Sequence, residues 1–462
     1  MEVLNKFTFL DSNKKKILSN VFWAMTGKVV NMLGALFVGI LIARYLGPEQ
    51  YGVMNYVISY VTLFSVLATF GLSNIEVREL AKSPENRNAI LGTCFRLRLF
   101  FSTVAYILIV VTLVVFKTDL FTTTMILLYG LTLYTQCCFE VIRNYFTSIV
   151  KNEYIVKTEI ARTLIGAGIK IVLLLIKAPL WCFIVAVIFD TILVASGYTM
   201  SYKKIVGKIN EWFYDKTLTP YLVKQSFPLV LSGAAVIIYQ RIDQVMIGNM
   251  LSKTEVGYFA TAGKFVDLIL FLPMVLVQTV TPLLVRAKEQ DVTIYENKKR
   301  TFVSITTWTA IFMSLVVSLF AYWLIKYSYG EKYILAVPVL QVMSFKAVGM
   351  ALFSSGGQII IIERLQKWAF IKNLLGCVLC VILNYLLIPR YGILGSAWVT
   401  IITVLFTGCF ANFLIPAYHN VMKVQLYALF CGWKELFFIK NYAKISRIAK
   451  NELFMSFSPQ QR

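Results

Sequence analysis

The sequence is poor in acidic residues and has almost no histidine. Its 462 residues include 23 Asp and Glu against 45 Lys and Arg, and a single histidine, His419. No GxxxxGK[ST] loop is present, so direct use of ATP through such a loop is not expected. One CxxC pair, Cys377 and Cys380, lies in an apolar stretch without a second pair of ligands, so we expect neither a metal site nor a metal cofactor.

Polar stretches long enough for a soluble domain are also missing, and apolar runs take their place. Hydrophobic residues make up 58% of the chain, and the mean hydropathy is +0.71. About 20 apolar residues in a helix cross the hydrocarbon layer of a bilayer. We therefore predict an all-α, polytopic membrane protein with about twelve transmembrane helices, at 18–43, 52–75, 97–116, 121–145, 159–177, 181–202, 225–251, 257–285, 302–326, 333–362, 368–388 and 392–415.

The distribution of Lys and Arg predicts the orientation of these spans. If the N-terminus is cytoplasmic, most of the 45 Lys and Arg residues fall in cytoplasmic segments, and the external loops hold few of them. Positive charge collects on the cytoplasmic side of helical membrane proteins. We therefore expect both termini to be cytoplasmic and the net charge of +22 to reflect orientation, with no nucleic acid as partner.

The two halves of the chain resemble each other. RYLGPEQYG joins the first two spans and NMLSKTEVG joins the seventh and eighth, so that Leu46 and Gly52 align with Leu251 and Gly257. Six spans in each half make a parallel repeat. We predict a six-helix lobe at 1–202, a second at 203–415, and an interfacial or cytoplasmic tail at 416–462, in which the segment 424–439 could form an interfacial helix or a thirteenth span.

Several charged and polar residues lie deep within predicted spans, on four helices at matching places in the two halves. Ionisable residues inside a membrane usually face a water-filled cavity or a partner. We predict that the following residues line a central cavity that binds substrate: Lys28, Asn31, Asn55, Ser59, Arg241, Asp243, Lys264 and Asp267. The alternative is that these side chains pair with one another and only hold helices together. Lys264 and Asp267, three residues apart, can pair on one helix face.

Other charges suggest local pairs. Glu140 is spaced to pair with Arg143 or Asn144, and Glu159 with Arg162. Asp190 has no partner on its own helix, and Lys170 is expected to extend its amine toward the membrane surface.

Three long stretches resemble one family of transporters. They are RYLGPEQYGVMNYVISYVTLFSVLATFGL, the stretch from PLVLSGAAVIIYQRIDQVMIG to FLPMVLVQTVTPLL, and LNYLLIPRYGILGSAWVT. They are similar to the Wzx-type polysaccharide and O-antigen lipid flippases of the multidrug/oligosaccharidyl-lipid/polysaccharide (MOP) exporter superfamily. The resemblance implies a V-shaped, MATE-like bundle of two lobes in the bacterial plasma membrane. It also implies that a lipid-linked sugar repeat unit on undecaprenyl pyrophosphate is flipped from the inner to the outer leaflet.

On this interpretation the protein is a transporter and not an enzyme. Arg241 would be the main contact for pyrophosphate, helped by Lys28 and Lys264, because guanidinium and ammonium groups bind phosphate. The membrane potential, or antiport of H⁺ or Na⁺ carried by Asp190, Asp243 or Asp267, would drive transport. A polymerase and a chain-length regulator are the expected protein partners, besides membrane lipids.

Two other functions stay open at this point. One is a MATE-like antiporter of drugs or cations, and the other is a membrane polysaccharide polymerase or glycosyltransferase. The cations in the predicted cavity disfavour the first, and the short external loops with a lone histidine disfavour the second.

Overall fold

The computed structural model describes residues 2–116 and 118–437, with side chains described from residue 30 onward. The described residues form helices and no strands. The first lobe contains α1 (Glu2–Thr69), α2 (Leu72–Lys82), α3 (Arg87–Phe116), α4 (Leu120–Gly130), α5 (Cys138–Ser148), α6 (Asn152–Leu175) and α7 (Leu180–Ile205). The second contains α8 (Leu218–Met250), α9 (Lys253–Gln290), α10 (Val292–Ser328), α11 (Ala336–Met343), α12 (Lys346–Ile362) and α13 (Ala369–Gly408).

The predicted set of twelve spans agrees with these helices. Nine stretches of the described chain are long and apolar enough to cross a membrane. Two of them, Val30–Lys82 and Gln366–Leu414, each hold two predicted spans, because α1 bends at Gly47 and α13 bends at Gly392. Both glycines have a positive φ, 74° and 60°, which other residues rarely adopt. The charged helix α6 supplies the remaining span. The prediction of an all-α membrane protein with about twelve spans is confirmed.

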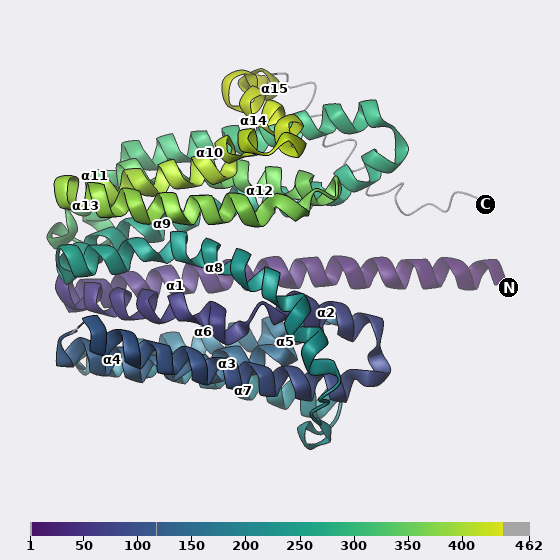
Figure 1. The fold of residues 1–462 in the computed structure, drawn as a ribbon, viewed down its shortest axis with the longest axis horizontal. Helices are drawn as coiled ribbons and strands as arrows, with labels where there is room; N and C mark the ends of the chain where they lie inside the picture. Colours follow the sequence, from purple (N-terminus) through teal and green to yellow (C-terminus); the bar gives the residue numbers. More distant parts are fainter. Residues whose placement is uncertain (1, 117, 438–462) are drawn as a thin grey trace.

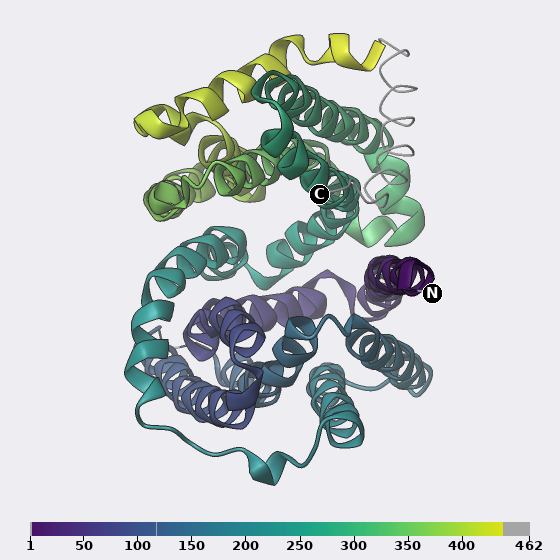
Figure 2. The same ribbon diagram turned by 90° about the vertical axis from the view of Figure 1, so that its right-hand side faces the viewer.

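Two predicted spans are interrupted rather than continuous. Between α4 and α5 the chain makes a π-helical turn at Leu133–Cys137, and Ser344 and Phe345 separate α11 from α12. The long helices run side by side in two lobes, which Figure 2 shows nearly end-on, and the lobes meet along α1, α8 and α9.

At one end of the bundle the lobes touch through two glycines, the same pair that the internal repeat aligns. A Cβ atom on Gly52 would lie 1.7 Å from the backbone oxygen of Lys253, and one on Gly257 would lie 2.1 Å from that of Pro48. Only glycine permits backbones to approach this closely. This contact lies at the end of the bundle that the distribution of Lys and Arg predicts to be external. The close approach of the backbones shows that the two lobes are closed at this end.

Aromatic side chains reinforce this closure. The hydroxyl of Tyr333 donates to the backbone oxygen of Ala43 at 2.7 Å, and that of Tyr56 donates to Asn249 Oδ1 at 2.6 Å. The ammonium of Lys253 lies 3.0 Å from the centre of the Tyr56 ring, a cation–π contact between the two lobes. These contacts join α1 to helices of the second lobe.

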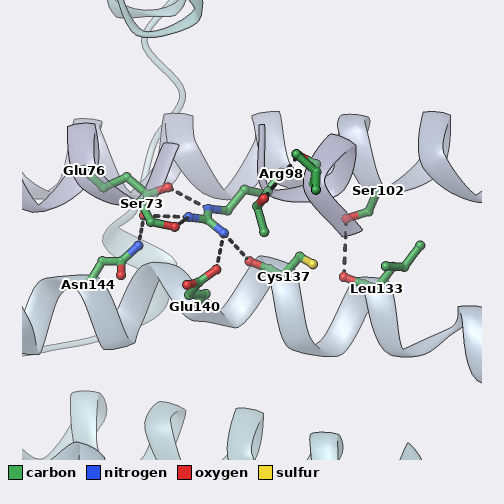
Figure 3. Close-up of polar contacts among 10 residues, drawn as sticks. Ser73, Glu76, Arg98, Ser102, Leu133, Cys137, Glu140 and Asn144 are labelled. Carbon is green, nitrogen blue, oxygen red and sulfur yellow. Dashed lines mark hydrogen bonds and ion pairs between the residues drawn. The ribbon is translucent and has the colours of Figure 1, made fainter. Parts of the chain in front are cut away.

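A buried ionic network fixes α2 to α3 and α5 in the first lobe (Figure 3). Arg98 donates to both oxygens of Glu76, at 2.6 and 3.0 Å, and to Glu140 at 2.9 Å. It also donates to the backbone oxygen of Cys137, the last residue of the π-helical turn. Asn144 donates to Glu76. The predicted local pairing of Glu140 is therefore wrong, because its helix face turns toward α3.

The tail begins with α14 (His419–Cys431) and α15 (Trp433–Phe437), which run across the long helices in both views (Figures 1 and 2). Gln425 anchors α14 by donating to the backbone oxygens of Leu352, at 2.9 Å, and Gly408, at 2.7 Å. This transverse direction agrees with an interfacial helix. The rest of the tail lies outside the described residues.

Candidate functional site

Two cavities lie beside the junction of the lobes. The first has a volume of about 270 Å³ and is lined by α1, α6, α7 and one residue of α9; the second, of about 210 Å³, is lined mainly by α8, α9, α11 and α12. Asn55 and Lys264 line both, so the cavities adjoin. We call them together the central cavity. Its charged lining residues are Arg162, Lys170, Asp190, Arg241, Asp243, Lys264, Asp267 and Lys346.

Most of the residues predicted to line a cavity do so. The central cavity contains Asn31, Asn55, Arg241, Asp243, Lys264 and Asp267. Ser59 is instead 1% exposed and does not line the cavity; it donates at 2.7 Å to Oε1 of Gln244, a cavity-lining residue, and so joins α1 to α8. Lys28 lies among the residues whose side chains are outside the described part.

The first lobe contributes two cations that the sequence patterns did not assign to the cavity. Lys170 forms an ion pair with Asp190, so the expectation that Lys170 extends to the membrane surface is wrong. Arg162 reaches Asn31 Oδ1 at 3.4 Å instead of pairing with Glu159. Glu159 accepts from Asn31 and Tyr198, each at 3.2 Å. These contacts cross between helices, and spacing within one helix cannot reveal them.

The second lobe contributes three cations without a protein partner. Within the part of the chain that the structure describes, Arg241, Lys264 and Lys346 have no hydrogen bond or ion pair, although all three line the central cavity. The predicted pair between Lys264 and Asp267 is not formed there. Lys346 is the first residue of α12. Because it has no partner on its own helix, the sequence pattern did not identify it as a cavity residue. Cations held in a cavity without partners provide a site for a polyanion.

Asp243 is the most buried acidic residue of the cavity. Its residue is 2% exposed, and its carboxylate accepts from Asn384 at 2.7 Å, Thr400 at 2.8 Å and the Cys380 thiol at 3.5 Å. Ser396 donates to Asn384 Oδ1 at 2.8 Å and completes the cluster. All of these donors are neutral, and Asp243 forms no ion pair among the described residues, although the positive charge of Lys346 lies within electrostatic reach of its carboxylate. Clustered carboxylate, amide and hydroxyl oxygens suit a proton or a hard monovalent cation.

Comparison with known proteins decides the family. A family model described as "Polysaccharide biosynthesis protein" matches residues 17–288, more than half of the chain. The chain belongs to this family. A search of curated proteins gave no match to this polysaccharide biosynthesis protein.

The fold of this chain is similar to that of several transporters of known structure. A lipid II flippase, MurJ, in an inward closed conformation is similar with a TM-score of 0.66 and 15% identity, over 95% of this chain and 98% of that chain. An inward-facing MATE multidrug resistance transporter of the MOP superfamily gives 0.64 and 14%, over 87% and 96%. The MATE multidrug transporter DinF-BH gives 0.60 and 15%, over 88% and 96%. The chain shares the fold of these transporters, and its long apolar helices make it a multi-pass membrane protein.

Proposed function

We propose that this protein is a flippase for lipid-linked oligosaccharides. It moves repeat units carried on undecaprenyl pyrophosphate, as for O-antigen or another surface polysaccharide, from the inner to the outer leaflet of the bacterial plasma membrane. The observation that carries the proposal is the set of three unpartnered cations, Arg241, Lys264 and Lys346, in the central cavity between the lobes. A pyrophosphate supplies the negative charges that these side chains lack.

The two parts of the cavity suit the two parts of the headgroup. The cations on α8, α9 and α12 bind the pyrophosphate, and the amides of Asn31 and Asn55 offer hydrogen bonds to sugar hydroxyls at the first lobe. Asp267, which is exposed in the cavity, offsets part of the positive charge when no substrate is bound. The polyprenyl tail stays in the lipid. Release on the outer side requires separation of the Gly52 and Gly257 backbones.

Asp243 is the best of the three candidate sites for a coupling cation. Asp190 is already paired with Lys170, and Asp267 is exposed. Asp243 is buried among neutral donors and forms no ion pair among the described residues, so binding H⁺ or Na⁺ neutralises a charge in the protein interior. The membrane potential is the alternative source of energy. Moving two negative charges outward releases about 4–5 kcal/mol per 100 mV when the inside is negative.

The charge of the cavity argues against a drug or cation antiporter. Five cationic side chains line it against three carboxylates, and one of these carboxylates is already paired with a lysine. An organic cation would meet repulsion from Arg241, Lys264 and Lys346. We accordingly favour the anionic lipid substrate over the MATE-like alternative. A polymerase and a chain-length regulator of the same pathway are the proposed protein partners.

Substitution of Arg241 tests the proposal. Hydrogen bonds to charged groups contribute about 1.5–3 kcal/mol, so Arg241→Ala is expected to weaken headgroup binding roughly 10- to 150-fold. A strain that depends on this variant should lose surface polysaccharide and accumulate the lipid-linked repeat unit on the inner face. Lys326→Ala is the matched control, because Lys326 is a cation at the closed end that binds Tyr322 and Glu331 outside the cavity. Normal export by an Arg241→Ala protein present at wild-type level would refute the proposal.

A further inference from the structure

A column of polar side chains runs through the interior of the second lobe and meets the central cavity only at Asp243. It consists of Ser232, Tyr239 and Asp243 on α8, Asn373, Cys380 and Asn384 before the bend of α13, and Ser396, Thr400, Thr403 and Thr407 after it. We call this set the seam. On α8 and on the first part of α13 its members recur after seven and then four residues, spacings that keep them on one helix face. All except Ser232 are buried.

The seam extends from Asp243 to the end of the bundle predicted to be cytoplasmic. At its inner end Thr400, Asn384 and Cys380 donate to the Asp243 carboxylate. At its other end Asn373 donates to Ser232 Oγ at 3.1 Å and links α13 to α8. The start of α8 and the start of α13 lie on the same side of the bundle, so the seam follows both helices toward that side.

Three polar atoms between Asp243 and the outer end of the seam lack a regular hydrogen bond to the described part of the protein. They are Tyr239 Oη, Thr403 Oγ1 and Asn373 Oδ1, and none of them makes a hydrogen bond of ordinary geometry within the described part of the chain, although Thr407 lies near Tyr239 and the Cys380 thiol lies near Thr403. Their residues are 2%, 0% and 6% exposed. Buried polar groups are almost always hydrogen-bonded, to protein or to ordered water. Three such atoms along one column therefore indicate water inside it.

Several other buried threonines satisfy their hydroxyls within their own helix, although Thr307 on α10, like Thr403, does not. Thr306 on α10 is 0% exposed like Thr403, and its hydroxyl donates to the backbone oxygen of Phe302 at 2.8 Å. Thr261 on α9 satisfies its hydroxyl in the same way with Gly257 at 2.8 Å. A threonine in a helix interior usually bonds its own helix. The Thr403 hydroxyl lacks such a bond, which leaves it free for another partner.

We propose that the seam holds a file of water molecules that connects Asp243 with the cytoplasmic side and bypasses the central cavity. A headgroup bound to Arg241 and Lys264 would block access to Asp243 from the cavity, since all three residues line it. The seam gives a small cation a second route to the same carboxylate while the cavity is occupied. This role rests on the proposed coupling at Asp243, whereas the presence of water in the seam does not.

Thiol accessibility tests the seam directly. Thr403→Cys and Thr306→Cys are made separately in the full-length protein in membrane vesicles. Both are treated with aminoethyl methanethiosulfonate, a small water-soluble cation, and modification at each position is followed by peptide mass spectrometry, so the native cysteines stay in place. Thr403→Cys is expected to react at least ten times faster than Thr306→Cys. Equal rates at the two positions would overturn the proposal.

Changes at Asn373 test the direction of access. Asn373→Leu fills the outer end of the seam with an apolar side chain and should slow modification at position 403 tenfold or more, with no effect at position 306. Asn373→Ala widens the same end and should speed modification at 403, which keeps the test valid if the leucine variant does not fold. Rates at 403 that respond to neither change would contradict a cytoplasmic route. Thiol labelling does not depend on transport, so the two proposals can fail separately. Equal labelling rates would overturn the water file but not the flippase proposal, and normal export by Arg241→Ala would overturn the flippase proposal but not the water file.

Discussion

Replacing Gly52 by alanine is expected to force the lobes apart at their closed end. The new Cβ would lie 1.7 Å from the backbone oxygen of Lys253 and 2.9 Å from the nitrogen of Gly257. Non-bonded carbon contacts are most favourable near 3.5–4.0 Å, and a backbone oxygen cannot rotate away as a side chain can. Overpacking of this kind costs about 1–3 kcal/mol. Since about 1.4 kcal/mol is a factor of ten, the closed state should lose roughly 5- to 150-fold in population relative to the open one.

Distance measurements between spin labels can detect this shift. Arg44 and Tyr327 lie on opposite lobes at the closed end, where the Arg44 guanidinium donates to the backbone oxygen of Tyr327. Labels at these two positions should show one short distance in the parent protein and an added longer one in Gly52→Ala. Gly39→Ala on the same helix is the matched control, because no atom lies within 4 Å of its new Cβ. An unchanged distance distribution in Gly52→Ala would refute the reasoning.

Three further substitutions test other parts of the structure. Arg98→Met leaves the buried Glu76 carboxylate and the partly exposed Glu140 carboxylate without their cation, so it should lower the free energy of unfolding by about 3–5 kcal/mol, seen as a lower Tm in detergent. Arg143→Met, at a half-exposed side chain, is the control and should change this free energy by about 1 kcal/mol or less. Lys346→Met should weaken binding of inorganic pyrophosphate about tenfold or more, measured by calorimetry; unchanged affinity would remove Lys346 from the site. Asp243→Asn should abolish the dependence of transport on the coupling cation while pyrophosphate still binds, and retained cation dependence would point to another acid.

The sequence was sufficient for the architecture because each span is a local property. Length and hydropathy define a membrane helix, and the repeat aligned Gly52 with Gly257, two residues that the fold then brings together. The boundaries were less accurate where the chain departs from regular helix. The π-helical turn before α5 and the break before Lys346 have no signal in hydropathy.

The cavity was only partly predictable, for a geometric reason. Helical periodicity identifies the polar face that carries Arg241 and Asp243, but it does not identify the helix that this face meets. The partner of Glu140, Arg98, lies on a neighbouring helix, and so the predicted local pair failed. Asp190, for which no local pair was predicted, is paired with Lys170 on a neighbouring helix as well. The same limit explains Ser59, whose hydroxyl is buried against Gln244 of the other lobe, a residue that itself lines the cavity.

Reconstitution in liposomes is the most direct test of the central claim. The purified protein is incorporated with an undecaprenyl-pyrophosphate-linked oligosaccharide, and an external glycosidase reports how much of the lipid-linked sugar reaches the outer leaflet. We expect wild-type protein and the Lys326→Ala control to bring the oligosaccharide of the inner leaflet to the outer leaflet, where the glycosidase cleaves it. Arg241→Ala should leave this oligosaccharide uncleaved. The flippase account would be contradicted if the lipid-linked oligosaccharide of the inner leaflet stayed protected from the glycosidase while the same wild-type protein exchanged an organic cation across the membrane. That result would favour the antiporter.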